Sequence, residues 1–329
     1  MEFEYQVIRL KREDNKLINQ LLDIASEIHN RKRDDINWFR WKYFDSPFGE
    51  SICLLAVKNG KIAGEVTFGK YEFINNRKPI PCLISYQTMV HPQHQKKGIF
   101  SKLTREILII AKKEKIELLF NFPNKESYTP FLKLNFTPIN HIKNYINISN
   151  KISFFKSPTS LKNPFIATKI SDIDSDQIEL LKKLKKEIIP LNIENTLTPN
   201  RNYQYIKWRF FSYPLYNYKL VITSLGFAIV RTGTRGLFNE VQIMDLFSKD
   251  KYNKAFILSV KKEIINTLKP TLISINISNS HPINKFLKYS GFISFPHSIS
   301  FFTFTYSLNF LPYMHKDKWV ITATEFHRY

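Results

Sequence analysis

The chain has 329 residues, of which 43% are hydrophobic and 15% aromatic, enough to fill the cores of two domains of ordinary size. Its formal net charge is +21, but the basic residues are spread along the chain and no helix-turn-helix, RNA-binding or zinc module is recognisable. We therefore expect no direct nucleic-acid partner, while attraction to an anionic cofactor, an anionic glycan or a membrane surface stays open.

Cysteine content and hydropathy restrict the class of protein further. Only Cys53 and Cys82 are present, too few for a disulfide framework, and no spacing resembles a zinc-ligand set, so we expect no metal. The first residues, MEFEYQVIRL, are acidic where a signal peptide is basic. No run approaches the roughly 20 apolar residues that span a bilayer. These features predict a cytoplasmic protein without a transmembrane segment.

The first third of the chain begins with a predicted helix and continues with strands. The helical region covers about residues 15–30, and WKYFDSPF (residues 41–48) precedes a strand-like run, ICLLAV (residues 52–57). The segment VKNGKIAGEVTF (residues 57–68) is typical of a β-hairpin, because Asn59-Gly60 is a strong turn signal.

A strand, a basic loop and a helix follow in that order. The strand is CLISYQTMV (residues 82–90), the loop is HPQHQKKGIF (residues 91–100), and the helix-like segment is SKLTREILIIAKKEK (residues 101–115). Gly98 allows close backbone approach to a ligand, and the first turn of a helix leaves N–H groups unpaired. The pattern predicts a phosphate site, although neither standard nucleotide-binding motif is present.

The chain then repeats this organisation. WRFFSYPL (residues 208–215) repeats the pattern of WKYFDSPF, and each copy leads into a strand and a glycine-containing turn. NFPNKESYTPFLKLNF (residues 121–136) is echoed by NISNSHPINKFLKYSGF (residues 276–292). A second opening helix is predicted at residues 176–187, and residues 149–164 are the expected connection. The order predicts a tandem duplication of a mixed α/β fold with helices on both faces of a sheet.

These segments resemble the GCN5-related N-acetyltransferase (GNAT) superfamily. MVHPQHQKKGIFSKL (residues 89–103) is similar to the family's Gln/Arg-x-x-Gly-x-Gly/Ala signature, and LLFNFPNKESYTPFLKLNF (residues 118–136) to its strand, Asn and short helix. The resemblance implies two tandem GNAT folds, which are mixed α/β folds. It places a GNAT domain with an acetyl-CoA site at residues 1–150, a linker at 151–165 and a degenerate GNAT-like domain at 166–329.

The resemblance also implies roles for individual residues. Backbone N–H groups from Gln95 to Phe100 would hold the pyrophosphate of acetyl-CoA, with Lys96 or Lys97 adding charge, and Met89 and Val90 would pair with the pantetheine arm. The implied cofactor-binding residues are Met89, Val90, Gln95, Lys96, Lys97, Gly98, Ile99, Phe100 and Asn124.

The sequence departs from the family in three places. Phe100 replaces the second small residue of the signature, and Phe131 stands where a general-acid tyrosine is common, with Tyr128 nearby. In the second copy, Lys254 corresponds to Gly98 when Phe256 is set against Phe100, and a side chain there obstructs backbone approach. We therefore expect one coenzyme A per chain, with the second half shaping the acceptor pocket or buttressing the first sheet.

Acyl transfer needs a base, an oxyanion donor and a proton for the departing thiolate. The candidate catalytic residues are Glu65 or Tyr86 as base and Tyr128 as acid, and the family implies the N–H near Val90 as oxyanion donor. Strand alternation predicts Tyr86 and Gln87 on opposite faces. The alternative for Glu65 is a solvated position on its hairpin.

His91 and His94 are expected to be exposed loop residues, with a phosphate contact as the alternative. Trp38, Trp41 and Tyr43 form an aromatic cluster that could line an acceptor pocket. Core packing is favoured for Trp41, because the second copy keeps Trp208.

The sequence thus predicts an N-acetyltransferase that moves the acetyl group of acetyl-CoA to an amine by direct attack, without a covalent intermediate. The expected acceptor is a small molecule, an amino sugar or a surface-glycan precursor, and both a monomer and a homodimer fit. One alternative is a peptidoglycan-type aminoacyltransferase that uses aminoacyl-tRNA, which the net charge of +21 favours. The other is a non-catalytic binding protein on a GNAT fold.

Overall fold

The structure is a computed structural model that describes residues 3–30, 33–157, 159–167, 179, 181–184, 193–215 and 218–325. The predicted second opening helix at residues 176–187 falls largely outside the described residues. Within the described part, no helix is long and apolar enough to cross a membrane.

The chain divides into two compact units that are each assembled from separate stretches of sequence. The first unit comprises Met1–Phe73, Pro79–Asn140 and Ser300–Met314. The second unit comprises Ile74–Lys78, His141–Ile299 and His315–Tyr329. Strands β6 (Thr137–Ile148) and β13 (Ile293–Thr305) are divided between the units, so each unit takes strand residues from the other half of the sequence.

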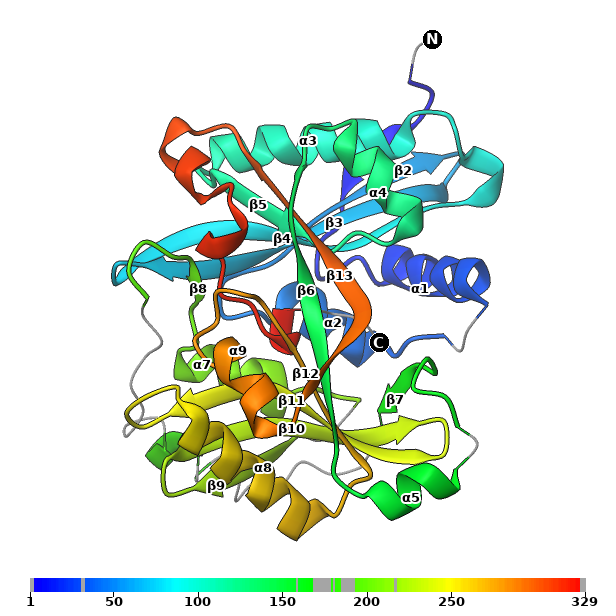
Figure 1. The fold of residues 1–329 in the computed structure, drawn as a ribbon. Helices are drawn as coiled ribbons and strands as arrows, with labels where there is room; N and C mark the ends of the chain where they lie inside the picture. The colour runs from blue at the N-terminus through cyan, green and yellow to red at the C-terminus, as the bar shows by residue number, and fades with distance from the viewer. Residues whose placement is uncertain are drawn as a thin grey trace. The chain divides into compact units, whose positions relative to one another are not determined.

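The first unit is built on a mixed sheet with strand order β1-β2-β3-β4-β5-β13 (Figure 1). Besides β13, the strands of this sheet are β1 (Gln6–Arg9), β2 (Ile52–Lys58), β3 (Lys61–Asn75), β4 (Lys78–Val90) and β5 (Leu118–Asn121). Strands β2 and β3 are antiparallel and form the predicted hairpin, whereas β4 and β5 are parallel. The parallel pair requires a crossover, which the helix after the basic loop provides.

Helices cover both faces of this sheet. They are α1 (Asn15–His29), α2 (Ile36–Phe44), α3 (Ile99–Lys113) and α4 (Lys125–Leu132). Leu103 and Ile107 of α3 and Phe131 of α4 pack into one apolar core with the strands. Helix α2 contacts the other face, where Tyr43 donates a hydrogen bond to Glu65 of β3. The helices predicted at residues 15–30 and after the basic loop are confirmed.

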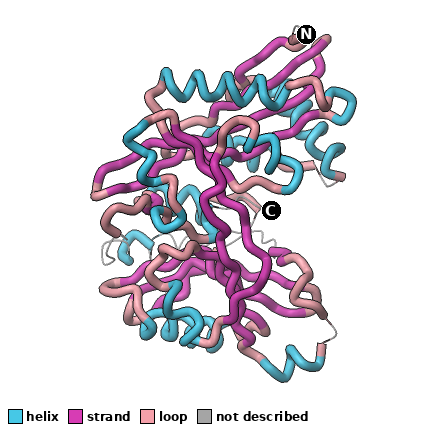
Figure 2. Tube along the Cα trace, turned by 45° about the horizontal axis from the view of Figure 1, so that its top comes forward, coloured by secondary structure: helices cyan, strands magenta, loops and turns pink. Residues whose placement is uncertain are grey.

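The second unit repeats this order of elements, as the sequence predicts. Its strands follow the order β6-β12-β11-β10-β7, and β9 also pairs with β10. Figure 2 shows that the described chain combines helices (cyan) with strands (magenta). The elements are β7 (Phe165–Ala167), β8 (Thr198–Pro199), β9 (Lys219–Thr223), β10 (Gly226–Arg235), β11 (Phe238–Ser248), β12 (Leu272–Ile277), α5 (Lys151–Lys156), α7 (Tyr203–Ile206), α8 (Lys254–Leu268) and α9 (Asn284–Leu287).

Short 3₁₀ or π turns complete the described elements. They are η1 (Pro92–His94), η2 (Lys207–Phe211), η3 (Lys288–Ser290), η4 (Leu308–Tyr313), η5 (Lys316–Lys318) and η6 (Ala323–Glu325). Turn η2 contains the first four residues, WRFF, of the segment WRFFSYPL.

The repeated segments WKYFDSPF (residues 41–48) and WRFFSYPL (residues 208–215), here called the tryptophan motif, have a packing role in each unit. Trp41 and Trp208 are both buried, which confirms the core position predicted for Trp41. The basic residue that follows each tryptophan is buried as well: the Nζ of Lys42 lies 4.9 Å from the ring centre of Trp38, and the guanidinium of Arg209 lies 5.5 Å from that of Phe210. Cation–π contacts therefore hold both copies of the motif in place.

Candidate functional site

The junction between β4 and α3 leaves the N-terminus of α3 open. Gly98 is the N-cap residue, with φ of 77°, and no side chain caps the helix. A Cβ added at Gly98 would meet no atom within 4 Å. Lys96 also has a positive φ of 62°, so the loop turns twice through the left-handed region before the helix begins. Successive N–H groups in such a turn, together with the helix dipole, form a site suited to an anion.

Hydrogen bonds at His91 and His94 hold the loop between β4 and α3 against other elements of the first unit. The backbone N–H of His91 donates to the carbonyl of Ala63 at 2.9 Å, and the hydroxyl of Tyr5 lies 3.1 Å from Nδ1 of His94. Both histidines are half-buried, so the expectation that they are exposed is wrong. Burial, followed by the charge of Lys97, lowers the pKa of His94. The lowered pKa favours the neutral form of His94, and its contact with Tyr5 anchors the loop.

Strands β4 and β5 separate towards this junction. Their ladder joins only residues 82–84 to residues 118–120, although β4 continues to Val90. Because His91 donates its N–H to β3, the alternation of an extended strand directs the N–H of Val90 to the opposite edge, which faces the β5 side. The carbonyl group of Met89 faces β3, because its oxygen would lie 3.1 Å from a Cβ added at Gly64 of that strand. The backbone of Val90, rather than that of Met89, therefore presents its groups to the gap between β4 and β5.

The remaining loop and helix residues divide into exposed and buried groups. Gln95, Lys96 and Lys97 are exposed, and the side-chain amide of Gln95 donates to the carbonyl of Val90 at 3.4 Å. Ile99 is buried, and Phe100 packs edge-on against the ring of Phe131 at a centroid distance of 5.1 Å.

Phe100 and Phe131, the two positions that depart from the family pattern, thus contact each other, and Phe131 belongs to the first unit's core. The side chain at position 100 points into the protein, so it does not obstruct the helix N-terminus.

Asn124 is the N-cap of α4. Its Oδ1 accepts hydrogen bonds from the backbone N–H of Ser127 at 2.8 Å and from the Ser127 hydroxyl at 2.7 Å. The structure thus gives Asn124 a capping role, and no partner of its amide nitrogen is found among the described residues. That nitrogen is the group of Asn124 with which a ligand could interact.

Glu65 lies on the other face of the first unit's sheet and is fully buried. One carboxylate oxygen, Oε1, accepts hydrogen bonds from Tyr43 at 2.9 Å and Thr67 at 2.6 Å, while Oε2 has no hydrogen-bond partner in the described structure. Burial raises the pKa of Glu65, against the opposing effect of these donors and of Lys42. Glu65 is therefore not a solvated hairpin residue. A proton can reach it only through neighbouring groups, and Tyr43 is one of these, with its hydroxyl also 3.1 Å from Oε1 of Gln87.

Tyr86 and Gln87 both reach the side of the sheet that α2 covers, so the prediction that they lie on opposite faces is wrong. The ring of Tyr86 lies 5.5 Å from Nζ of Lys42, and Gln87 contacts Tyr43 of the same helix. A Cβ added at Gly69 would lie 2.0 Å from the Tyr86 ring, so this glycine makes room for it. Leu83 and Val90 both pack into the core under α3 although they are seven positions apart, so strict alternation is interrupted within this part of β4.

At the end of β5, Asn121 is a polar residue that the sequence analysis missed. It is 1% exposed, and neither atom of its amide has a hydrogen-bond partner in the described structure. Tyr128 of α4 lies close to this strand end, because its ring packs at 4.7 Å on Phe302, the strand partner of Asn121. A terminal Asn after the apolar run Leu118, Leu119, Phe120 was the available signal.

The corresponding helix of the second unit is closed by a side chain. Asn253 is the N-cap of α8, and its Oδ1 accepts a hydrogen bond from the backbone N–H of Phe256 at 2.9 Å. The N-cap position that Gly98 occupies in the first unit is thus occupied by Asn253, and not by Lys254 as the sequence predicts, because Lys254 is the first residue of α8. The capping bond occupies one of the N–H groups that an anion would need.

The strands of the second unit also separate, but the chain itself fills the gap. The parallel ladder joins residues 240–243 of β11 to residues 272–275 of β12. Beyond it, Ile277 pairs with Lys143 of β6 on one side and with Thr322 in an antiparallel bridge. Because β6 occupies the other edge of β12 at Ile277, the bridge to Thr322 lies on the edge that faces β11. The hydroxyl of Thr324 donates a hydrogen bond to the carbonyl of Met244 of β11 at 3.0 Å. Residues 321–325 therefore lie between the two strands.

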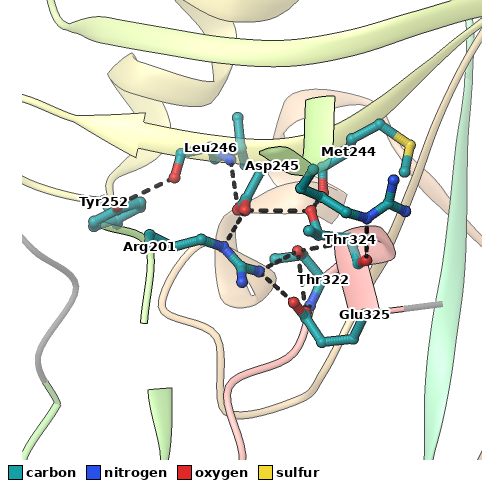
Figure 3. A network of polar contacts seen from close by, with 9 residues as sticks. Arg201, Met244, Asp245, Leu246, Tyr252, Thr322, Thr324 and Glu325 are labelled. Atoms are coloured by element: carbon teal, nitrogen blue, oxygen red, sulfur yellow. Dashed lines mark hydrogen bonds and ion pairs between the residues drawn. The ribbon is translucent and has the colours of Figure 1, made fainter. Parts of the chain in front are cut away.

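A buried ion-pair network holds this segment (Figure 3). Arg201 donates hydrogen bonds to Asp245 of β11 and, at 2.6 Å, to Glu325. The hydroxyl of Thr324 also lies 3.2 Å from Asp245. Burial is the main cause that raises the pKa of Asp245. The second unit thus has a charged structural cluster where the first unit has an open gap.

Among the residues that the structure describes, no group of three or more His, Cys, Asp or Glu side chains could hold a metal ion.

Comparison with known proteins defines the class. Residues 6–133 match the family described as Acetyltransferase (GNAT) domain, which confirms the resemblance seen in the sequence. This part of the chain thus matches a GNAT domain, and acyl transfer is the general activity that the GNAT fold supports. A search of curated protein sequences gives no match.

Solved structures with the same fold cover most of the chain. The tandem GNAT protein from the clavulanic acid biosynthesis pathway has a TM-score of 0.51 at 10% identity, over 92% of this chain and 98% of that one. Eis1 from Mycobacterium abscessus has a TM-score of 0.57 at 9% identity, over 92% and 73%. Saccharomyces cerevisiae N-myristoyltransferase with bound myristoyl-CoA has a TM-score of 0.56 at 12% identity, over 93% and 80%. The predicted fold class, tandem GNAT folds of mixed α/β structure, is confirmed.

Proposed function

We propose that the protein transfers the acetyl group of acetyl-CoA to an amine, with an amino sugar or a surface-glycan precursor as acceptor and the cytoplasm as location. The observation that carries the proposal is the uncapped N-terminus of α3 at Gly98, beside the gap between β4 and β5. An anionic group and an extended arm are the two parts of coenzyme A that such a junction suits.

The residues of the loop would bind the anionic part of the cofactor. The N–H groups at the start of α3 would bind the pyrophosphate, and the exposed Lys96 and Lys97 would add positive charge. The N–H of Val90, directed into the gap, would donate to the pantetheine arm or to the developing oxyanion. Bound acetyl-CoA supplies an activated thioester, so no nucleophilic side chain is required.

The proton transfers would use groups on both faces of the sheet. The amine nitrogen forms the new bond to the carbonyl carbon as the carbon–sulfur bond breaks, and the amine proton leaves to a base. Glu65, whose pKa is raised by burial, would accept that proton through Tyr43, with Tyr86 as the alternative base. Tyr128 would supply a proton to the thiolate.

In the second unit, Asn253 caps α8 and residues 321–325 lie between β11 and β12. Both features support a single cofactor site per chain, in the first unit.

Calorimetric titration of acetyl-CoA into the protein tests the proposal. We expect one binding site per chain in the wild type and loss of binding in Gly98→Glu, which places a negative side chain in front of the helix N-terminus. Gly60→Glu is a matched control, because Gly60 also has a positive φ, of 73°, and open space around its Cβ position, but lies in the β2–β3 turn. It should bind like the wild type.

Absence of binding by the wild type would overturn the proposal and favour an aminoacyltransferase or a non-catalytic binding protein. The structural similarity to a protein with bound myristoyl-CoA makes acyl chain length the next variable to test. Competition between acetyl-CoA and longer acyl-CoA thioesters in the same titration would measure that preference.

A further inference from the structure

Asn121 is an energetic anomaly in the first unit. It is the last residue of β5, is 1% exposed, and has neither a donor for its Oδ1 nor an acceptor for its Nδ2 in the described structure. Burying an amide without hydrogen bonds is unfavourable, so such groups are rare in proteins and call for a physical reason. Bulk solvent does not reach the amide, because the residue is almost fully buried.

The strand pairing shows where this amide lies. The last β4 partner along β5 is Ile84, which is paired with Phe120, so Asn121 is the first β5 residue beyond the ladder. On its other side, Asn121 is paired with Phe302 of β13. Asn121 is therefore held in the sheet by β13 alone, at the closed end of the gap between β4 and β5.

The face of the sheet follows from the same pairing. Alternation puts the side chain of Asn121 on the face of Leu119, and antiparallel pairing puts it on the face of Phe302. Both of these residues belong to the core under α3 and α4. The amide thus lies on the side of the sheet where α3 begins, among apolar neighbours that cannot satisfy it.

We propose that the Asn121 side chain binds an amide group of the ligand arm that enters the gap between β4 and β5. An Asn amide has both a donor and an acceptor, so it can pair with a ligand amide through two hydrogen bonds. The pantetheine arm of coenzyme A carries amide groups and matches this requirement. The assignment rests on the proposed function, and it names a binding residue that lies three positions before Asn124.

Ligand entry must displace the side chains that cover Asn121, because bulk solvent does not reach it in this state. Tyr128 is among the residues at this strand end, since its half-buried ring packs on Phe302. Its hydroxyl has no hydrogen-bond partner among the described residues, which leaves the ring able to move without breaking one. The cost of the unpaired amide in the ligand-free protein is then recovered on binding.

The test compares Asn121→Leu with Asn276→Leu, a substitution at the buried asparagine of the corresponding repeat segment in β12. Calorimetry would measure the affinity of each protein for coenzyme A and for ADP, which contains a pyrophosphate but no amide arm. We expect Asn121→Leu to weaken coenzyme A binding by about tenfold or more and to leave ADP binding unchanged. Asn276→Leu should leave both affinities unchanged.

Thermal unfolding of the ligand-free protein provides the second readout. Removing an unsatisfied buried amide should leave the Tm of Asn121→Leu equal to or above that of the wild type. A large decrease in its Tm would mean a structural role and overturn the assignment, as would wild-type affinity for coenzyme A. Failure of the wild type to bind coenzyme A would instead overturn the proposed function itself, so the two failures are distinguishable.

Discussion

The two strand-to-helix junctions, at residues 90–99 in the first unit and 248–254 in the second, have the same order of elements and different helix N-termini. Gly98 leaves the start of α3 uncapped, whereas the side chain of Asn253 caps α8. The gap beside the first junction is lined by backbone of Val90, and the gap beside the second contains residues 321–325. In the second unit the chain itself supplies the hydrogen-bond partners that a ligand would supply in the first.

A second difference concerns buried charge. Glu65 pairs with Leu55 in the β2–β3 hairpin. In the β9–β10 hairpin, the pair at the same position counted from the turn is Ile229 and Leu220, which are both apolar. At this hairpin position, a buried carboxylate thus occurs in the unit with the open junction, and an apolar residue occupies the position in the other unit. In the second unit, the buried carboxylates Asp245 and Glu325 both form ion pairs with Arg201. The buried Glu65 thus belongs to the candidate site of the first unit, whereas the buried ion pairs of Arg201 stabilise the position of residues 321–325 in the second.

The largest effect is expected for Arg201→Leu, which tests the segment that fills the second gap. The change leaves two buried carboxylates without their cation, so we expect the free energy of unfolding to fall by about 3–5 kcal/mol in urea titrations. Arg12→Leu breaks the exposed pair with Asp45 and is the control, with almost no expected change. A loss for Arg201→Leu as small as the control's would mean that the network does not fasten residues 321–325.

Glu65→Gln tests the buried carboxylate of the first unit. We expect turnover to fall by about 100-fold, because the amide cannot accept the proton, with little change in cofactor affinity. If Glu65 is only structural, the variant should keep near-normal turnover once it is folded.

The pKa shift of Glu65 also predicts a pH dependence of stability. Its folded-state pKa is raised above the ordinary carboxyl value, so the stabilisation is fully present below the unfolded-state pKa and is lost as the pH rises through the folded-state pKa. Denaturant midpoints measured across that range should fall more steeply with pH in the wild type than in Glu65→Gln. Equal slopes would contradict the raised pKa.

A smaller effect is expected for Asn253→Ala, which removes the cap of α8. Loss of an N-cap hydrogen bond typically costs about 1 kcal/mol, which denaturant titration can resolve. The number of cofactor sites per chain should remain one, because residues 321–325 still lie between β11 and β12. A second binding site in this variant would show that the cap alone closes the junction.

Local sequence signals predicted much of the candidate site. The strand, basic loop and helix at residues 82–115 lie where the pattern placed them, because a positive φ at Gly98 and an amphipathic helix depend on neighbouring residues. Burial of Glu65 and the shared face of Tyr86 and Gln87 could not be predicted in this way. Both depend on α2, which packs on this face from more than 20 residues earlier in the chain.

The sequence by itself determined the repeat, the order of elements and the glycine at the start of α3, because each is set by residues close together in the chain. Only the tertiary structure decided where each strand ladder ends. The side-chain amide of Asn121 therefore lies without a hydrogen-bond partner at the end of a gap, and Thr322 pairs with Ile277. These pairings join distant segments, and their stability depends on which surfaces become buried together. No local pattern at either residue specifies that outcome.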